Sequence, residues 1–211
     1  MQKLLKSHGG QVENIKLVSM DMSAAFEAGF RQNFPNAEIT FDKFHLSQSA
    51  NKAVDSVRKD ERKGHEALKN TRYTLLYGNE DLPIDKGTEL DDIIESHPKI
   101  GLAYELTEVF RDLYSISDAE SAASHLAFWC DKADDSNLVP FQSFAKTIRN
   151  HWNGIIAYFK FGKLNNGLHE SINTKIQLAK RRARGFANID NFIHIIYFIS
   201  SKLKLDYHTI H

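Results

Sequence analysis

The feature that most constrains the fold is a pair of short apolar runs near the N-terminus, each ending in an acidic residue. The runs cover Lys16–Asp21 and Ala37–Asp42. Between them, Ser23 is a candidate N-cap for a helix that ends near Pro35, because the residue before a proline is pushed out of helical geometry. This order of strand, helix and strand predicts two parallel strands joined by a right-handed crossover.

Beyond the second run the strand signal disappears, and the sequence from about Phe44 onward has mainly the periodicity of helices. The clearest pattern lies in residues 141–159, where large apolar side chains recur at helical spacing on one face. The acidic stretch 79–98 contains two prolines and a glycine and is predicted to be a surface loop or a helix break. Helices are also expected at about 168–182 and 189–203. The chain is therefore predicted to be an α/β protein that is mostly helical overall.

A sheet of two strands is too small to be stable by itself, since three or more strands are normally needed. At 211 residues the chain is long enough to bury a sizeable core. We therefore expect that strands which should pair with these two are absent from this chain.

The composition points to a cytoplasmic protein. The single cysteine, Cys130, cannot form an internal disulfide, and residues 1–10 lack the apolar core of a signal peptide. No run approaches the roughly 18 apolar residues of a membrane span, so a membrane is not an expected partner. Cys130 follows Phe128 and Trp129 and has no basic neighbour in the sequence, which favours a place in the core over a role as nucleophile.

The formal net charge of zero conceals a strong segregation of charge along the chain. Counting Lys and Arg against Asp and Glu gives +2 for residues 1–70 (11 and 9), −10 for residues 71–140 (5 and 15) and +8 for residues 141–211 (11 and 3). Such asymmetry is typical of a polyanion-binding surface next to an acidic one. Two solvated helical surfaces of opposite sign would explain the counts equally well.

Asp21 and Asp42 each follow a predicted strand. In open parallel sheets, ligand sites form beyond the carboxyl ends of the strands, and neighbouring strands lie about 4.8 Å apart. Carboxylates held there suit hard divalent ions such as Mg²⁺ or Mn²⁺. Alternatively, an acid after a strand caps the next helix. Asp21 is the better metal candidate, because Ser23 is available for capping.

Glu170 is a third candidate acid, in the predicted helix 168–182. It shares a face with bases at steps of three and four residues; the set is Glu170, Asn173, Gln177, Lys180, Arg181 and Arg184. A carboxylate on a basic face is suited to holding a metal ion while Lys and Arg contact phosphates. A solvated face with ion pairs inside the helix is the alternative. The spacing around His45 and His169 resembles no zinc site, and no glycine-rich phosphate loop is present.

Several short motifs resemble, in the same order, the ISL-three family of insertion-sequence transposases. They are Val18–Ser23, Phe34–Ala37, Phe41–His45 and Lys180–Phe186, extended by Thr71–Tyr73 and Phe144–Arg149. The resemblance covers the chain from about Lys16 to Leu203.

This resemblance implies an RNase H-like catalytic core, in which two Asp residues and one Glu bind two divalent ions, Mg²⁺ or Mn²⁺. Asp21 matches the second Asp, and Glu170 matches the Glu. Asp42 is an acid beside the site with a less certain role. No residue before Asp21 stands in a motif that matches the first Asp of the family.

The resemblance also implies the organisation of the chain. Residues 1–45 would form a partial RNase H-like core, residues 46–165 a large all-helical insertion, and residues 166–211 the C-terminal helices of the core.

The expected function is that of a transposase fragment. The complete enzyme would cleave and transfer DNA strands with the help of metal ions. This chain is expected to be catalytically incomplete, because the first Asp is missing. The alternative is a non-catalytic remnant that binds DNA or dimerises. Expected partners are DNA and either a second copy or a full-length transposase, without a small-molecule cofactor. The expected DNA-binding residues are Lys180, Arg181, Arg182 and Arg184.

Overall fold

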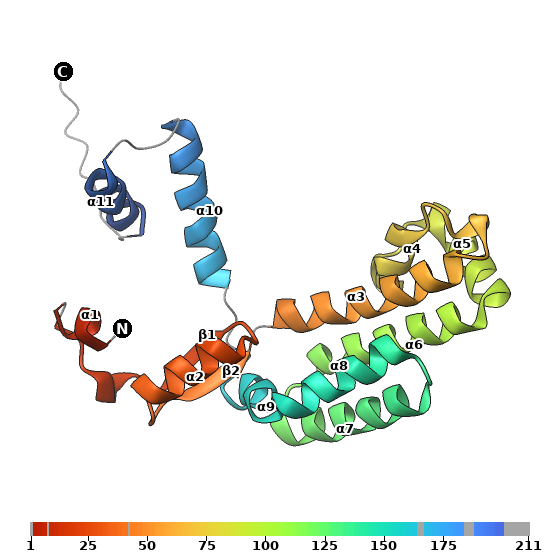
Figure 1. Cartoon of the computed structure of the whole chain (residues 1–211), viewed down its shortest axis with the longest axis horizontal. Helices are drawn as coiled ribbons and strands as arrows, with labels where there is room; N and C mark the ends of the chain where they lie inside the picture. The colour runs from red at the N-terminus through yellow and green to blue at the C-terminus, as the bar shows by residue number, and fades with distance from the viewer. Residues whose placement is uncertain (1, 8, 42, 164–166, 184–187, 201–211) are drawn as a thin grey trace. The chain divides into compact units, whose positions relative to one another are not determined.

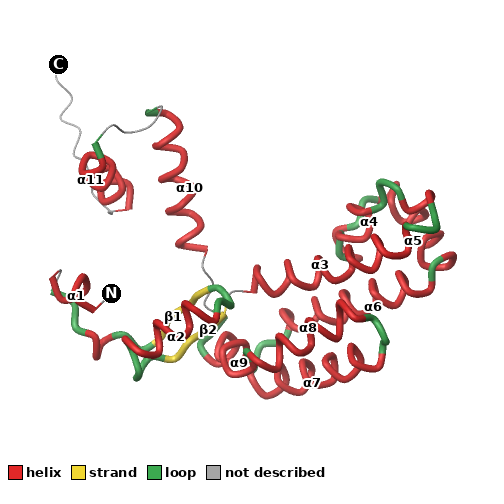
Figure 2. The backbone as a smooth tube through the Cα atoms, in the orientation of Figure 1, coloured by secondary structure: helices red, strands yellow, loops and turns green. Residues whose placement is uncertain are grey.

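The computed structural model describes residues 2–7, 9–41, 43–163, 167–183 and 188–200. They fall into two compact units, residues 1–164 and residues 165–211. The described residues are mainly helical, and their strands are the two short ones shown in yellow in Figure 2. The prediction of a mostly helical chain with a small parallel sheet is therefore confirmed. None of the described helices has both the length and the apolar character that crossing a membrane requires.

The first unit holds the two strands and most of the helices (Figure 1). Its elements are α1 (Gln2–Ser7), β1 (Leu17–Met20), α2 (Ala24–Asn33), β2 (Glu38–Phe41), α3 (Lys43–Arg62), α4 (Arg72–Leu76), α5 (Ile84–Ser96), α6 (Pro98–Asp112), α7 (Ala119–Asp135), α8 (Val139–Asn150) and α9 (Trp152–Lys160). Short 3₁₀ turns cover Val12–Asn14, Glu66–Leu68, Asn79–Asp81 and Leu113–Ser115. The second unit contains α10 (Gly167–Arg182) and α11 (Ile189–Ser200), which contact each other.

The two strands are parallel, as predicted, and α2 connects them. Their register places Leu17 opposite Glu38 and Met20 opposite Phe41, so both strands end at the same edge of the sheet. Ser23 occupies the N-cap position of α2, but its side chain makes no capping hydrogen bond.

Helix α9 covers β2 at very short range, which the sequence allows because it places a glycine at the contact. Phe41 of β2 is 2% exposed and lies against Gly154 of α9. An ideal Cβ at Gly154 would lie 2.5 Å from Cδ2 of Phe41, too close for any other residue without a shift. The ring of His151, at the junction of α8 and α9, meets Phe41 edge-on with ring centroids 5.0 Å apart.

The core of the helical part of this unit is centred on Trp129 of α7, which is fully buried. Its ring contacts Phe110 of α6 and Phe144 of α8, with centroids 5.1 and 5.2 Å away. Its indole nitrogen donates a hydrogen bond to the carbonyl oxygen of Leu106 at 2.7 Å, so burial leaves this donor satisfied. The adjacent Cys130 is 1% exposed, and burial raises the pKa of its thiol to about 11. The prediction that Cys130 belongs to the core is confirmed.

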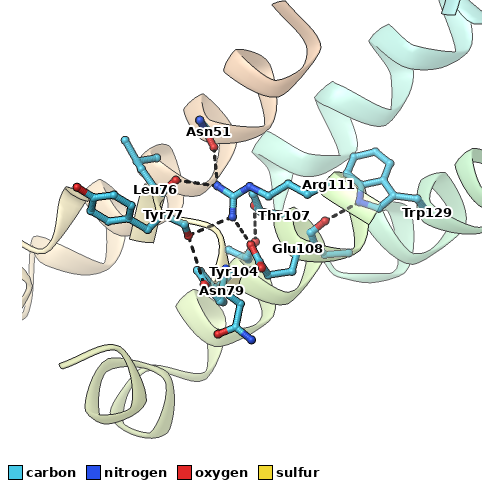
Figure 3. Close-up of polar contacts among 11 residues, drawn as sticks. Asn51, Leu76, Tyr77, Asn79, Tyr104, Thr107, Glu108, Arg111 and Trp129 are labelled. Atoms are coloured by element: carbon cyan, nitrogen blue, oxygen red, sulfur yellow. Dashed lines mark hydrogen bonds and ion pairs between the residues drawn. The ribbon is translucent and has the colours of Figure 1, made fainter. Parts of the chain in front are cut away.

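Arg111 of α6 ties three segments of the first unit together (Figure 3). Its guanidinium donates hydrogen bonds to the carbonyl oxygens of Leu76 (2.8 Å) and Tyr77 (3.1 Å) and to Oδ1 of Asn51 (3.2 Å). It also pairs with Glu108, one turn earlier on the same helix. Because a cation stabilises the carbonyl end of a helix, Arg111 fixes the end of α4 against α3 and α6.

The prediction for the stretch 79–98, a surface loop or a helix break, is right only in part. The stretch contains α5, with Leu90 and Ile93 buried, and the chain breaks between α5 and α6 at His97. The two prolines of this stretch stand at helix starts, Pro83 as the N-cap of α5 and Pro98 in the first turn of α6, where a missing N–H costs nothing.

The apolar pattern in residues 141–159, predicted to lie on one helical face, is shared by two helices, α8 and α9. The break is at His151, where φ is −111° and ψ is 17°. The expected helices at 168–182 and 189–203 correspond to α10 and α11, the latter described up to Ser200. The RNase H-like fold and the boundaries at 45 and 165 stay predictions.

Candidate active site at the end of the sheet

Asp21 lies directly after β1, at the carboxyl end of the strand. Its side chain is 52% exposed, so the carboxylate reaches solvent beyond the sheet. The neighbouring strand ends at the same edge, since Met20 is paired with Phe41. Asp42, which follows Phe41, lies outside the described residues. Of the two acids predicted to follow the strands, the structure therefore describes the position of Asp21 alone.

His45 contacts Asp21, an arrangement that the sequence patterns did not predict. Nε2 of His45 is 2.6 Å from Oδ1 of Asp21, and the imidazole is 35% exposed. Helix α3 begins at Lys43, two residues after β2 ends, so its first turn lies at the edge where the parallel strand β1 ends. The position of His45, directly after the predicted strand that ends at Phe41, could have indicated this contact. A helix that starts immediately after one strand places its first turn beside the end of the neighbouring parallel strand.

The chemistry of this pair fits part of a divalent metal site. Mg²⁺ and Mn²⁺ prefer oxygen ligands, which the exposed carboxylate of Asp21 offers, and Nε2 of His45 lies against one of its two oxygens. Within the described ranges, no three His, Cys, Asp or Glu side chains gather closely enough to hold a metal ion. Asp21 therefore supplies one ligand of such a site, to which other carboxylates would have to be added, and His45 contacts that ligand.

Glu170 lies in the first turn of α10, in the second unit. Its side chain lies outside the part of the structure that is described, so its predicted pairing with Asp21 stays a prediction. Three of the predicted DNA-binding residues, Lys180, Arg181 and Arg182, occupy the last turn of α10 and are exposed. Arg184 lies outside the described residues. The exposed bases of α10 are thus available to a polyanion.

Comparisons with known proteins agree with the family that the sequence motifs resemble. The model of the ISL3 (ISL-three) family, DDE_Tnp_ISL3, described as transposase, matches residues 1–196. The transposase for insertion sequence element IS1001 of Bordetella parapertussis is 27% identical over 191 residues, which cover 87% of this chain and 47% of that protein. The transposase for insertion sequence element IS1557 of Mycobacterium tuberculosis is 35% identical over 119 residues, covering 56% of this chain and 26% of that protein.

The chain spans about half the length of the first of these relatives and about a quarter of the second. No solved structure matches it. Since the family model extends over residues 1–196 of 211, the chain belongs to the ISL3 family of DDE transposases.

Proposed function

We propose that this chain carries two of the acidic active-site residues of an insertion-sequence transposase, Asp21 and Glu170. The reaction class is metal-dependent cleavage and transfer of DNA strands. The observation that carries the proposal is the position of Asp21: an exposed carboxylate at the carboxyl end of a parallel strand, oriented by His45 at 2.6 Å. Membership of the ISL3 family supports it, as does the name of both relatives, transposase for an insertion sequence element.

In this proposal Asp21 and Glu170 bind Mg²⁺ or Mn²⁺ through their carboxylate oxygens, with Asp42 as a less certain further ligand. When bound, such ions activate water or a 3′-hydroxyl for in-line attack on a phosphodiester and stabilise charge on the leaving oxygen. The role of His45 is to keep Oδ1 of Asp21 in a fixed direction. Among the contacts of the described residues, the second oxygen of this carboxylate has no partner, so it remains available to an ion.

The proposed fold around these residues is an RNase H-like core that β1, α2, β2 and the C-terminal helices share, with residues 46–165 as a helical insertion. DNA is the proposed main partner. Lys180, Arg181, Arg182 and Arg184 would contact its phosphates, in keeping with the net charge of +8 in residues 141–211. A second copy or a full-length transposase is the other proposed partner, because a strand edge left unpaired invites another strand.

We also propose that these 211 residues alone do not cleave DNA. A site with two metal ions about 3.5–4 Å apart needs a carboxylate that bridges them, because their mutual repulsion otherwise opposes binding of the second ion. The chain offers counterparts for the family's second Asp and its Glu, but residues 1–20 contain no motif that matches the first Asp.

A nicking assay on supercoiled DNA tests this function. The chain would be incubated with Mg²⁺ or Mn²⁺ beside the double variant Asp21→Asn with Glu170→Gln. We expect equal, background nicking by both proteins, and metal-dependent nicking of the same DNA by an intact family transposase. If the native chain nicks the DNA and the double variant does not, the chain is catalytically complete and the acids are assigned correctly. If both the native chain and the double variant nick the DNA in the presence of the metal ion, the acids are assigned wrongly.

A further inference from the structure

Two lysines lie against Tyr114, which belongs to the 3₁₀ turn after α6. Lys43 is the first residue of α3, and its Nζ is 5.7 Å from the centroid of the Tyr114 ring. The Tyr114 hydroxyl donates a hydrogen bond to the carbonyl oxygen of Lys43 at 3.3 Å. Lys163 lies shortly after α9, and its Nζ donates a hydrogen bond to the carbonyl oxygen of Tyr114 at 2.8 Å. Tyr114 therefore brings together two cations that are 120 positions apart in the sequence.

The two ammonium groups keep most of their hydrogen-bonding capacity. Within the described residues, neither has a carboxylate oxygen within 4.0 Å, whereas the nearby Lys160 is paired with Glu38 at 3.0 Å. A lysine ammonium has three donors, so Lys163 retains donors beyond its bond to Tyr114. Two cations that contact one residue, one at its ring and one at its backbone carbonyl, create a positive potential that attracts an anion.

The backbone at Lys163 indicates that its side chain has a role. Its φ is +59°, in the left-handed region that glycine adopts freely and a lysine adopts at a cost. The preceding residue, Gly162, also has a positive φ, of +75°. A second glycine at position 163 would form the same turn without this cost. Strained backbone of this kind is concentrated at functional sites. A lysine at this position therefore favours a function for its ammonium group.

Lys43 adjoins the candidate active site, and Tyr114 links Lys163 to Lys43. Lys43 shares the first turn of α3 with His45, and His45 contacts Asp21 at 2.6 Å. We propose that Lys43 and Lys163 bind phosphate groups of the DNA strand that is presented to Asp21. Contacts to phosphates carry no sequence information but fix the position of the strand, which is what a cleavage site requires. This inference rests on the proposed function and adds a DNA contact in the first unit, separate from the bases of α10.

The test is the salt dependence of DNA binding, measured by fluorescence anisotropy with a labelled duplex. Each phosphate that a lysine neutralises adds about 0.9 to the slope of log K against log salt concentration. We expect the double variant Lys43→Gln with Lys163→Gln to lower that slope by about 1.8, because two phosphates are then no longer neutralised. The variant with Arg at both positions should keep the slope of the native chain, because the charge remains. Lys69→Gln, which removes an exposed lysine beyond the far end of α3, is the matched control and should leave the slope unchanged.

Thermal melting of each variant separates weaker DNA binding from a damaged fold. If Lys163 serves only to hold Tyr114, the Gln variants melt at a lower temperature while the salt slope stays native, and the inference is wrong. An unchanged slope in a chain that binds DNA overturns the inference and leaves the proposed function standing. A native chain with no salt-dependent affinity for DNA overturns the inference and the proposed DNA binding together.

Discussion

Nε2 of His45 and Oδ1 of Asp21 are 2.6 Å apart, and this contact joins the end of strand β1 to the first turn of helix α3. The two side chains are about a third and about half exposed, at 35% and 52%. An exposed pair of this kind contributes little to folding, so the contact is better explained by the orientation it gives to the carboxylate. Parallel pairing of the strands makes it possible, because the helix that follows β2 starts where β1 ends.

His45 is expected to orient the carboxylate of Asp21 without contributing much to the stability of the fold. His45→Ala should change the free energy of unfolding by less than about 1 kcal/mol, since exposed ion pairs rarely contribute more. The measurement is urea unfolding followed by circular dichroism. A loss of several kcal/mol would mean that His45 is a structural residue of the sheet edge rather than a positioning residue for Asp21.

Asp55 and Arg58 of α3 form an ion pair that is buried, in contrast to the exposed pair of His45 and Asp21. Their side chains are 8% and 6% exposed, and Nη2 of Arg58 is 2.8 Å from Oδ1 of Asp55. We predict that Asp55→Asn destabilises the chain by about 3 kcal/mol, because it leaves a buried guanidinium without its counter-ion. Asp60→Asn, which removes an acid that is 64% exposed on the same helix, is the control and should cost less than about 1 kcal/mol.

The same pair predicts how stability depends on pH. Burial alone would raise the pKa of Asp55, but hydrogen bonds from Lys59 and Arg58 outweigh it and hold the pKa below its ordinary value. A group with a depressed folded-state pKa stabilises the fold above its unfolded pKa, about 3.9 for Asp, and loses this contribution as the pH falls through the folded value. The urea midpoint of the native chain should therefore fall more steeply below about pH 4 than that of Asp55→Asn. Parallel curves for the two proteins would contradict the assignment.

Gly154 is predicted to be irreplaceable because of its contact with Phe41. Gly154→Ala should destabilise the chain by about 1–3 kcal/mol, the usual cost of overpacking a core. Gly87→Ala in α5 is the control: nothing lies within 4 Å of the added Cβ, and alanine there should stabilise the helix by about 0.5–1 kcal/mol. Equal melting temperatures for the two variants would show that α9 and β2 do not pack this closely.

Local patterns in the sequence predicted the elements whose determinants are local. The strand before Asp21, the strand before Asp42 and the helix between them follow from short apolar runs and from Pro35, near which the helix ends. The helix corresponding to α10 and the burial of Cys130 follow in the same way from periodicity and apolar neighbours.

The features that the sequence did not predict depend on contacts between distant residues or on ambiguous signals. Pro83 and Pro98 indicate a loop as readily as two helix starts, so α5 was missed. The break at His151 is hidden because the apolar spacing from Ile148 to Ile155 continues across it. The contact of His45 with Asp21 depends on the register of the sheet, which no single segment specifies.

DNA binding by the C-terminal bases gives a further prediction. Replacing Lys180, Arg181, Arg182 and Arg184 together by Ala should weaken binding to DNA of any sequence and lower the salt slope by about 0.9 for each phosphate that is no longer neutralised. Fluorescence anisotropy over a series of salt concentrations measures both quantities. A variant that keeps the native affinity and slope would show that the exposed last turn of α10 does not face DNA.

The most direct measurement of the central proposal, that Asp21 and Glu170 are ligands of the same divalent metal site, is backbone cleavage by bound iron. Fe²⁺ in place of Mg²⁺, with ascorbate and peroxide, releases hydroxyl radicals that cut the chain beside the metal. We predict cuts near residue 21 and near residue 170, both suppressed by excess Mg²⁺ and both abolished in Asp21→Asn and in Glu170→Gln. Cleavage near residue 21 that persists in Glu170→Gln, or no cleavage near residue 170 in the native chain, would contradict the claim.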